Sequence, residues 1–200
     1  MKTPQLPASR VQELLKGLVP EYPAAILAVR GYYQKTMGNP DRNDVGIYDD
    51  AAFLLHPGGM IPTLWSTDPT RLGFNPGVGK NFAMLQPGDW FFIRGPHKGR
   101  TPALRQADEE EAKAAGIPDK GRFKVWRAAN MQQILDGTAK TELGYFAINC
   151  HCGGSTRPSS WGCQNEPADS YPAFLKQVWD ITKKLGMKRI PYRLIDGPVS

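Results

Sequence analysis

Residues 145–165 have the sequence YFAINCHCGGSTRPSSWGCQN, an apolar run that passes into a polar loop rich in Gly and Ser. The stretch holds all three cysteines of the chain, Cys150, Cys152 and Cys163, and one of its three histidines, His151. A Cys–His pair on such a loop can act as a nucleophile with its base, can bind a metal ion, or can belong to the end of a buried strand. The residues around the stretch must decide among these three alternatives.

The apolar run 145–150 predicts a strand, and side chains on a strand alternate between its two faces. Phe146, Ile148 and Cys150 then share the face that points to the core. The opposite, open face then carries Tyr145, Ala147, Asn149 and His151.

The other patterns along the chain predict more strands than helices, with the helices mainly at the ends. We therefore expect an α+β fold with a mostly β core and short flanking helices. Residues 90–94, apolar on both faces, predict a central strand, whereas Pro191 predicts that the last strand lies at an edge. Ser9 and Gln12 form a capping-box pattern for the first helix. The predicted strands cover 24–33, 51–55, 63–65, 90–94, 123–126 and 189–195, and the predicted helices cover 10–18, 107–115, 130–136 and 172–185.

The composition is that of a globular chain of 200 residues, a length that suits a single domain over residues 1–200. Hydrophobic residues make up 40% of the chain, and 21 Gly with 18 Pro indicate many turns and long loops. The formal net charge of +6 favours attraction to an anionic partner such as nucleic acid, a membrane surface or a bacterial cell wall. The Lys and Arg residues are scattered, so nucleic acid is not the expected partner.

The first residues, MKTPQLP, lack the apolar segment of a signal peptide, and no run of about 18 apolar residues predicts a membrane span. We therefore expect synthesis in the cytoplasm without a signal peptide. A chain that acts at the cell wall or in the periplasm would then reach its substrate after release or delivery.

Nucleophilic catalysis is the first alternative for the key stretch. A thiolate is the reactive form of cysteine, and a nearby imidazole can take the thiol proton. His151 ends the predicted strand, and Cys163 follows a loop that can fold back onto it. Gly162 lets the backbone approach a substrate carbonyl, and the N–H groups of Gly162 and Cys163 can stabilise an oxyanion. The carbonyl of Cys152 or the side chain of Asn149 can orient the imidazole.

A zinc site made of Cys150, Cys152, His151 and Cys163 is the second alternative. Alternation on the strand points both sulfurs of Cys-x-Cys one way and the histidine the other, and the Cys-x-x-Cys pairs of structural zinc sites are missing. We therefore predict no metal and no other cofactor. In the third alternative Cys150 packs in the core, Cys152 is incidental, and Cys163 is a small buried apolar residue. Spacing alone does not decide between this alternative and a nucleophilic Cys163.

Three further residues stand out elsewhere. His97 lies on a loop after the predicted central strand, where site residues often occur. Asp49 and Asp50 precede the strand 51–55, and adjacent acids at a strand start are most often solvated or accept loop N–H bonds.

The segment 160–165, SWGCQN, preceded by His151, resembles the signature of the YkuD-like L,D-transpeptidase family. That signature is a histidine on a strand and then, after a loop, Ser or Thr followed by His-Gly-Cys, one further residue, and Asn or Arg. The match consists of Ser160, Gly162, Cys163 and Asn165.

The resemblance covers about residues 85–165 and leaves residues 1–60 unmatched. Residues 86–90, QPGDW, are similar to a strand entry of the family, and the C-terminal part is similar to a phage-type variant group. Trp161 replaces the usual histidine, Gln164 replaces an apolar residue, and the loop between histidine and cysteine is shorter than usual. These departures leave substrate choice open.

The resemblance implies an L,D-transpeptidase-like β-rich fold and a cysteine enzyme that acts on bacterial peptidoglycan peptides by hydrolysis or transfer. Cys163 would be the nucleophile and His151 its base. The expected absence of a signal peptide fits a phage lysis protein or an injected effector. The alternatives are a non-catalytic protein that binds the wall or an assembly, and a Cys/His zinc protein. The residues predicted to bind substrate are Asn149, Ser160, Trp161, Gln164, Asn165 and His97.

Overall fold

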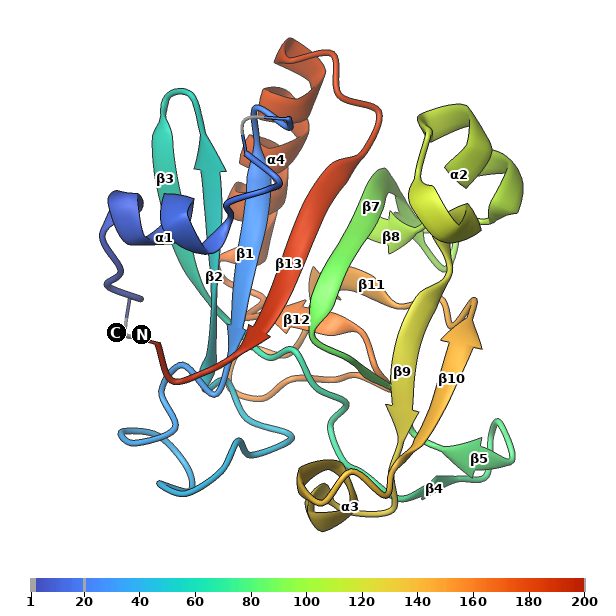
Figure 1. The fold of residues 1–200 in the computed structure, drawn as a ribbon. Helices are drawn as coiled ribbons and strands as arrows, with labels where there is room; N and C mark the ends of the chain where they lie inside the picture. Colours follow the sequence, from blue (N-terminus) through green and yellow to red (C-terminus); the bar gives the residue numbers. More distant parts are fainter. Residues whose placement is uncertain (1–2, 20, 200) are drawn as a thin grey trace.

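One sheet of eight strands organises the chain, and its strands come from both ends of the sequence (Figure 1). The computed structural model describes residues 3–19 and 21–199. Strands dominate over mostly short helices, which confirms the predicted α+β class with a mostly β core. In spatial order the strands are β12 (Gln164–Glu166), β11 (Asn149–Cys152), β8 (Thr101–Gln106), β7 (Gly88–His97), β13 (Ile190–Asp196), β1 (Ala25–Arg30), β2 (Asp50–His56) and β3 (Gly59–Trp65).

Smaller sheets and helices surround this sheet. A three-stranded sheet has the order β10 (Lys140–Gly144), β9 (Phe123–Arg127), β6 (Met84–Leu85), and a hairpin pairs β4 (Phe74–Asn75) with β5 (Lys80–Asn81). The helices are α1 (Ala8–Leu14), α2 (Glu109–Ala115), the 3-10 helix η1 (Pro118–Gly121), α3 (Met131–Leu135) and α4 (Tyr171–Lys184). Within the described ranges, no helix has the length and apolar character needed to cross a membrane.

The eight-stranded sheet is nearly closed because its two outer strands meet at one point. Ser66, directly after β3, forms an isolated antiparallel bridge with Asn165 in β12. The Ser66 N–H donates to the Asn165 carbonyl, and the Asn165 N–H donates to the Ser66 carbonyl, both at 2.8 Å. The bridge satisfies polar groups that an open sheet edge would leave exposed, and it holds the short strand β12 in place.

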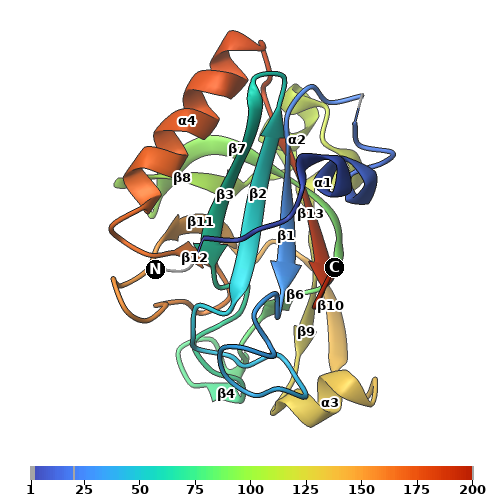
Figure 2. The same cartoon turned by 90° about the vertical axis from the view of Figure 1, so that its left-hand side faces the viewer.

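Strand β1 is buried on both faces because a helix covers each side of the sheet (Figure 2). Ile26 and Ala28 belong to the main core, to which α4 contributes Phe174. Leu27 and Val29 belong to a second core, which α1 covers from the other side. Burial on both faces explains why this segment is a nearly continuous apolar run.

Strand β7 confirms the prediction that residues 90–94 form a central strand. It lies between β8 and β13. Phe92 points into the main core, whereas Phe91 and Ile93 pack on the opposite face with Ala112 of α2. The two apolar faces predicted from the sequence are therefore covered by two different partners.

The predicted edge position of the last strand is wrong, because β13 lies between β7 and β1. Its antiparallel pairing with β7 begins at Ile190, whereas its parallel pairing with β1 begins only at Tyr192. Pro191 therefore lies where one neighbouring strand has not yet begun to pair. Its missing N–H removes no ladder bond on that side, so the proline is tolerated.

The first helix begins earlier than the predicted span 10–18. It covers Ala8–Leu14, with Pro7 at its N-cap and without a side-chain cap bond, so the predicted capping box does not form. The fixed φ of proline suits the start of a helix and replaces the expected signal. Leu15, just beyond the helix, is still buried in the second core.

The strand predicted over 145–150 begins only at Asn149. Ala147 has a φ of 52°, in the left-handed region, and this interrupts the extended run. From residue 148 onward the predicted alternation holds, with Ile148 and Cys150 in the main core and Asn149 and His151 on the opposite, cleft-facing side.

A buried polar network lies next to the bridge that closes the sheet. The Thr67 hydroxyl accepts a bond from Arg30 Nε at 3.1 Å and donates to Asp50 Oδ2 at 2.8 Å. Arg30 also pairs with Asp68 at 2.8 Å, and both side chains are buried. The Asp50 carboxyl oxygens accept further hydrogen bonds from the backbone N–H groups of Gly31 and Thr67. This is one of the two arrangements expected of adjacent acids at the start of a strand. Paired in this way, the buried charges are tolerated.

Asp49 lies beside this network, and its pKa predicts how the stability of the fold depends on pH. Burial, followed by the charge of Asp68, raises the pKa of Asp49 to about 7, from an ordinary value of 3.8. The folded chain therefore holds this proton more tightly than the unfolded chain. The resulting stability is complete below about pH 4 and is lost as the pH rises through about 7. Asp49→Asn, neutral at every pH, should raise Tm relative to wild type more at about pH 8 than at about pH 5.

Scanning calorimetry of both proteins at the two pH values measures this difference. Asp41→Asn, at an exposed position, is the matched control and should leave Tm unchanged at both. An Asp49→Asn shift of equal size at the two pH values would contradict the assignment.

Candidate functional site

Parallel pairing of β11 with β12 brings the two halves of the candidate site together. His151 is level with Asn165 in this pair. Residues opposite each other in a sheet point to the same face, and side chains two apart on a strand share a face. Cys163, two residues before Asn165, therefore faces the side of His151. The loop of residues 153–163 folds back, as predicted.

His151 and Cys163 lie in an open cleft of about 730 Å³, a volume within the usual range for ligand sites. The described side chains that line it include Lys98 and Arg71 and no carboxylate. This lining favours an anionic ligand. The other lining residues are Thr70, Phe82, His97, Phe146, Ala147, Ile148, Asn149, Ser159, Ser160, Trp161 and Gly162.

One tautomer of the His151 ring fits its surroundings. Its Nδ1 lies 2.7 Å from the carbonyl oxygen of Cys152. A carbonyl only accepts hydrogen bonds, so Nδ1 carries the proton and Nε2 carries the lone pair. The amide Nδ2 of Asn165, 3.4 Å from Nε2, is a donor that suits this assignment. Of the two groups predicted to orient the ring, the Cys152 carbonyl makes the contact.

The thiol of Cys163 is protonated at neutral pH. Burial raises its pKa, against the opposing effects of the Asn149 backbone N–H and the charge of Lys98. Its Sγ lies 3.6 Å from the carbonyl oxygen of Ala147 and donates to it. Burial also lowers the pKa of His151. The pair is therefore neutral, and the imidazole would have to take the proton during attack rather than hold a thiolate in advance.

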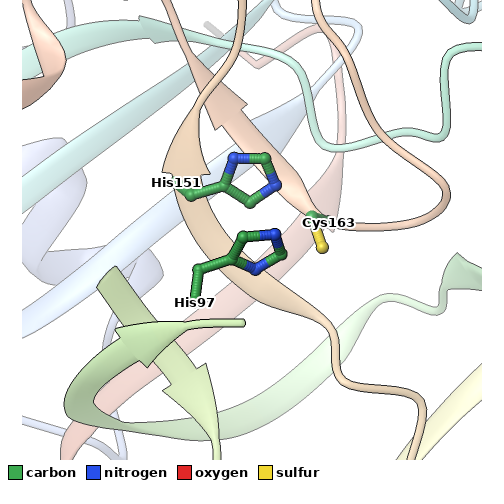
Figure 3. A group of neighbouring side chains, drawn as sticks. All are labelled: His97, His151 and Cys163. Carbon is green, nitrogen blue, oxygen red and sulfur yellow. The ribbon is translucent and has the colours of Figure 1, made fainter. Parts of the chain in front are cut away.

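His97, the last residue of β7, brings a second imidazole to the same point (Figure 3). The sequence predicts it only as a substrate-binding residue. Its ring stacks on that of His151, with centroids 4.2 Å apart and an angle of 26° between the planes. Burial, followed by the charge of His151, lowers the pKa of His97 to about 4. One side-chain donor atom each of His97, His151 and Cys163 lies within 4.8 Å of the other two.

The four-residue zinc set considered as an alternative does not assemble. Cys150 is buried in the main core, on the face opposite to His151. Among the described residues, the group that brings three donor atoms within reach of one metal ion is His97, His151 and Cys163. Zinc accepts such donors, but it requires a lone pair from each imidazole and loss of the thiol proton. The absence of a metal stays a prediction.

Ser160 supports the loop that carries the cysteine. Its hydroxyl donates to the Cys163 carbonyl at 2.6 Å and accepts from the Gly162 N–H at 2.8 Å. Thr70 binds the Ser160 backbone through both its N–H and its hydroxyl. The Gly162 N–H, which the sequence suggests as an oxyanion donor, is therefore engaged inside the loop.

Gln164 and Asn165, both predicted to bind substrate, are fully buried. Gln164 points to the core, where its Oε1 accepts from the Tyr192 hydroxyl at 2.8 Å. Asn165 Oδ1 accepts from the Ser159 N–H at 2.8 Å, which turns its Nδ2 toward His151. Both side chains hold the site from beneath.

Asn149 is likewise buried, and its amide contacts His97 rather than His151. Asn149 also lines the cleft, and its role in binding substrate stays a prediction.

Trp161 remains at the rim of the cleft, with 64% of its surface exposed. It packs edge to face on Phe82 at 6.3 Å, and the Arg71 guanidinium lies 5.2 Å from the Phe82 ring. Sequence reasoning misses Arg71 and Phe82, because no local pattern connects them to the distant cysteine loop. Lys98 could have been found, since it directly follows His97.

Comparison with known proteins gives no relative: no family profile matches the chain, no curated protein matches its sequence, and no solved structure matches its fold. The chemistry of the site therefore has to follow from its own geometry.

Gly162 generates a prediction about the loop. Its φ is 144°, and a Cβ at this position would clash with the carbonyl oxygen of Ala83. Gly59, the first residue of β3, has a φ of 135° with nothing within 4 Å of such a Cβ. Both alanine substitutions introduce backbone strain of about 1–3 kcal/mol, and only Gly162→Ala adds the clash. Chemical denaturation should show the larger loss of stability for Gly162→Ala, whereas equal losses would refute the close packing.

Proposed function

We propose that this chain is a cysteine enzyme that cleaves or transfers stem peptides of bacterial peptidoglycan on an L,D-transpeptidase-like fold. The observation that carries the proposal is a neutral His151 whose Nε2 bears a lone pair and lies with the Cys163 thiol in an open cleft. The resemblance of residues 151–165 to the YkuD-like signature supports the choice of substrate class.

In the proposed reaction, Cys163 Sγ attacks the carbonyl carbon of a peptide bond while His151 Nε2 takes the thiol proton. The Cys152 carbonyl stabilises the charged ring through the bond from Nδ1. The C–N bond then breaks, and the amine leaves with the proton held by His151. Water resolves the thioester to give cleavage, whereas an amine from a second stem peptide gives transfer.

The lining of the cleft suits such a substrate. Stem peptides carry carboxylates, and Lys98 with Arg71 supplies positive charge beside the thiol. The exposed ring of Trp161, which packs on the buried Phe82, offers apolar surface at the rim. The net charge of +6 acts in the same direction over a longer range. An enzyme of this kind would serve as a phage lysis protein or an injected effector that meets the wall after release or delivery.

Purified peptidoglycan tests the roles of the two residues. Cys163→Ala should reduce peptide release or exchange to background, because no other group forms the thioester. His151→Gln should lower the rate by about 10²–10⁴-fold, the usual contribution of a general base. His56→Gln, in the hairpin between β2 and β3, is the matched control and should keep the wild-type rate. Mass spectrometry of the soluble peptides measures the rate of peptide release or exchange for the wild type and the three variants.

A wild-type rate for Cys163→Ala would contradict the nucleophile assignment. Pelleting with peptidoglycan without any thiol-dependent product would instead support the alternative of a non-catalytic wall-binding protein.

A further inference from the structure

The second imidazole of the cleft, that of His97, has one hydrogen-bond partner that fixes its tautomer. Its Nδ1 lies 2.7 Å from the side-chain nitrogen Nδ2 of Asn149. An amide nitrogen only donates hydrogen bonds, so Nδ1 accepts and the proton of the neutral ring resides on Nε2. The assignment depends on which way the Asn149 amide points.

The backbone of β8 decides the orientation of this amide. Asn149 Oδ1 accepts from the Gln106 N–H at 3.2 Å, and the Ile148 carbonyl shares this donor at 3.1 Å. A flipped amide would set its NH₂ group against the Gln106 N–H at the same distance, so that two donors would face each other. It would also turn an oxygen toward His97. The orientation with Nδ2 toward His97 therefore satisfies more groups, and Asn149 is buried, so water does not replace the lost bond.

The two stacked rings thus have opposite tautomers. His151 presents a lone pair at Nε2, because its Nδ1–H binds the Cys152 carbonyl. His97 presents an N–H at Nε2. Figure 3 shows a nitrogen of each ring on the side of Cys163, and the three side chains have their donor atoms within 4.8 Å of one another.

Attack by a thiol on a carbonyl needs a donor for the oxygen that becomes negative. Of the two backbone donors that the sequence suggests, the Gly162 N–H is already bound to Ser160 Oγ at 2.8 Å, which leaves the Cys163 N–H and calls for a second donor. We propose that His97 is a catalytic residue that donates its Nε2–H to this oxyanion as a neutral imidazole. The proposal rests on the proposed cysteine chemistry and adds to it a role that the sequence does not suggest.

The proton balance of the step is simple. The C–S bond forms, the carbonyl electron pair moves to oxygen, and the thiol proton moves to His151 Nε2. His97 keeps its proton throughout and only donates a hydrogen bond. A neutral imidazole can fill this role.

Two small reagents separate this role from activation of the thiol. Iodoacetamide alkylates Cys163 at a saturated carbon and forms no oxyanion, whereas p-nitrophenyl acetate acylates it through one. His97→Phe keeps a flat ring on His151 and removes the donor. It should lower acylation by about 10²–10³-fold and leave alkylation unchanged, while His97→Gln, which retains an N–H donor, should recover part of the acylation rate. His56→Gln should change neither rate.

Equal loss of both rates in His97→Phe would overturn the inference, because His97 would then act on the thiol itself. Unchanged acylation would overturn it as well. A wild-type protein that is alkylated but not acylated at Cys163 would instead contradict the proposed function, and this inference with it.

Nitrogen NMR of the histidine rings gives a second measurement that needs no turnover. At neutral pH the proton should reside on Nε2 in His97 and on Nδ1 in His151. A proton on Nδ1 of His97 would overturn the inference and would leave a lone pair facing Cys163, as a metal ion requires.

Discussion

The rest of the structure depends on one pair of backbone hydrogen bonds, those between Ser66 and Asn165. Strand β12 has only three residues and β11 on one side, so the bridge to the end of β3 supplies its second neighbour. Beneath the bridge, the hydroxyl of Thr67 connects the buried side chains of Arg30 and Asp50, and Gln164 binds the Tyr192 hydroxyl in the core. The loop that carries Cys163 therefore ends in a strand held on both sides and from below. Closure of the sheet, together with the hydrogen bonds of Ser160 inside the loop, sets where the thiol lies.

The same closure reaches the reacting groups through side chains. Asn165 closes the sheet with its backbone and points its amide Nδ2 at His151. On the other side of the cleft, the backbone of β8 orients the Asn149 amide, which in turn contacts the ring of His97. Each imidazole therefore owes its tautomer to hydrogen bonds that the sheet positions, and two chemically identical side chains present opposite hydrogen-bonding groups to one thiol. Such support from a rigid scaffold is what a preorganised site requires.

Local patterns predicted part of this arrangement. Alternation along one strand separated Cys150 from His151, and apolar residues on both faces identified β7 as central. Features that depend on pairing between distant segments were beyond local patterns. Pro191 indicated an edge strand because a proline lacks the N–H that a central strand uses. The structure tolerates it because pairing with β1 starts only after Pro191, and that start is set by strands far away in sequence. Gln164 and Asn165 looked like substrate ligands because the sequence does not show the sheet closure that buries them. His97 is central to the site because the end of β7 contacts Asn149 of β11, a contact between segments distant in sequence. The left-handed Ala147, which shortens the predicted strand, has no signal in residue type.

The central claim is that Cys163 forms a covalent bond to the acyl group of a stem peptide. Intact-protein mass spectrometry after brief incubation with a purified tetrapeptide stem tests it most directly. We expect an added mass equal to the acyl part of the peptide, located by digestion on the peptide that contains Cys163 and absent from Cys163→Ala. Turnover of the substrate without such an adduct in the wild-type protein, or the same adduct on Cys163→Ala, would contradict it.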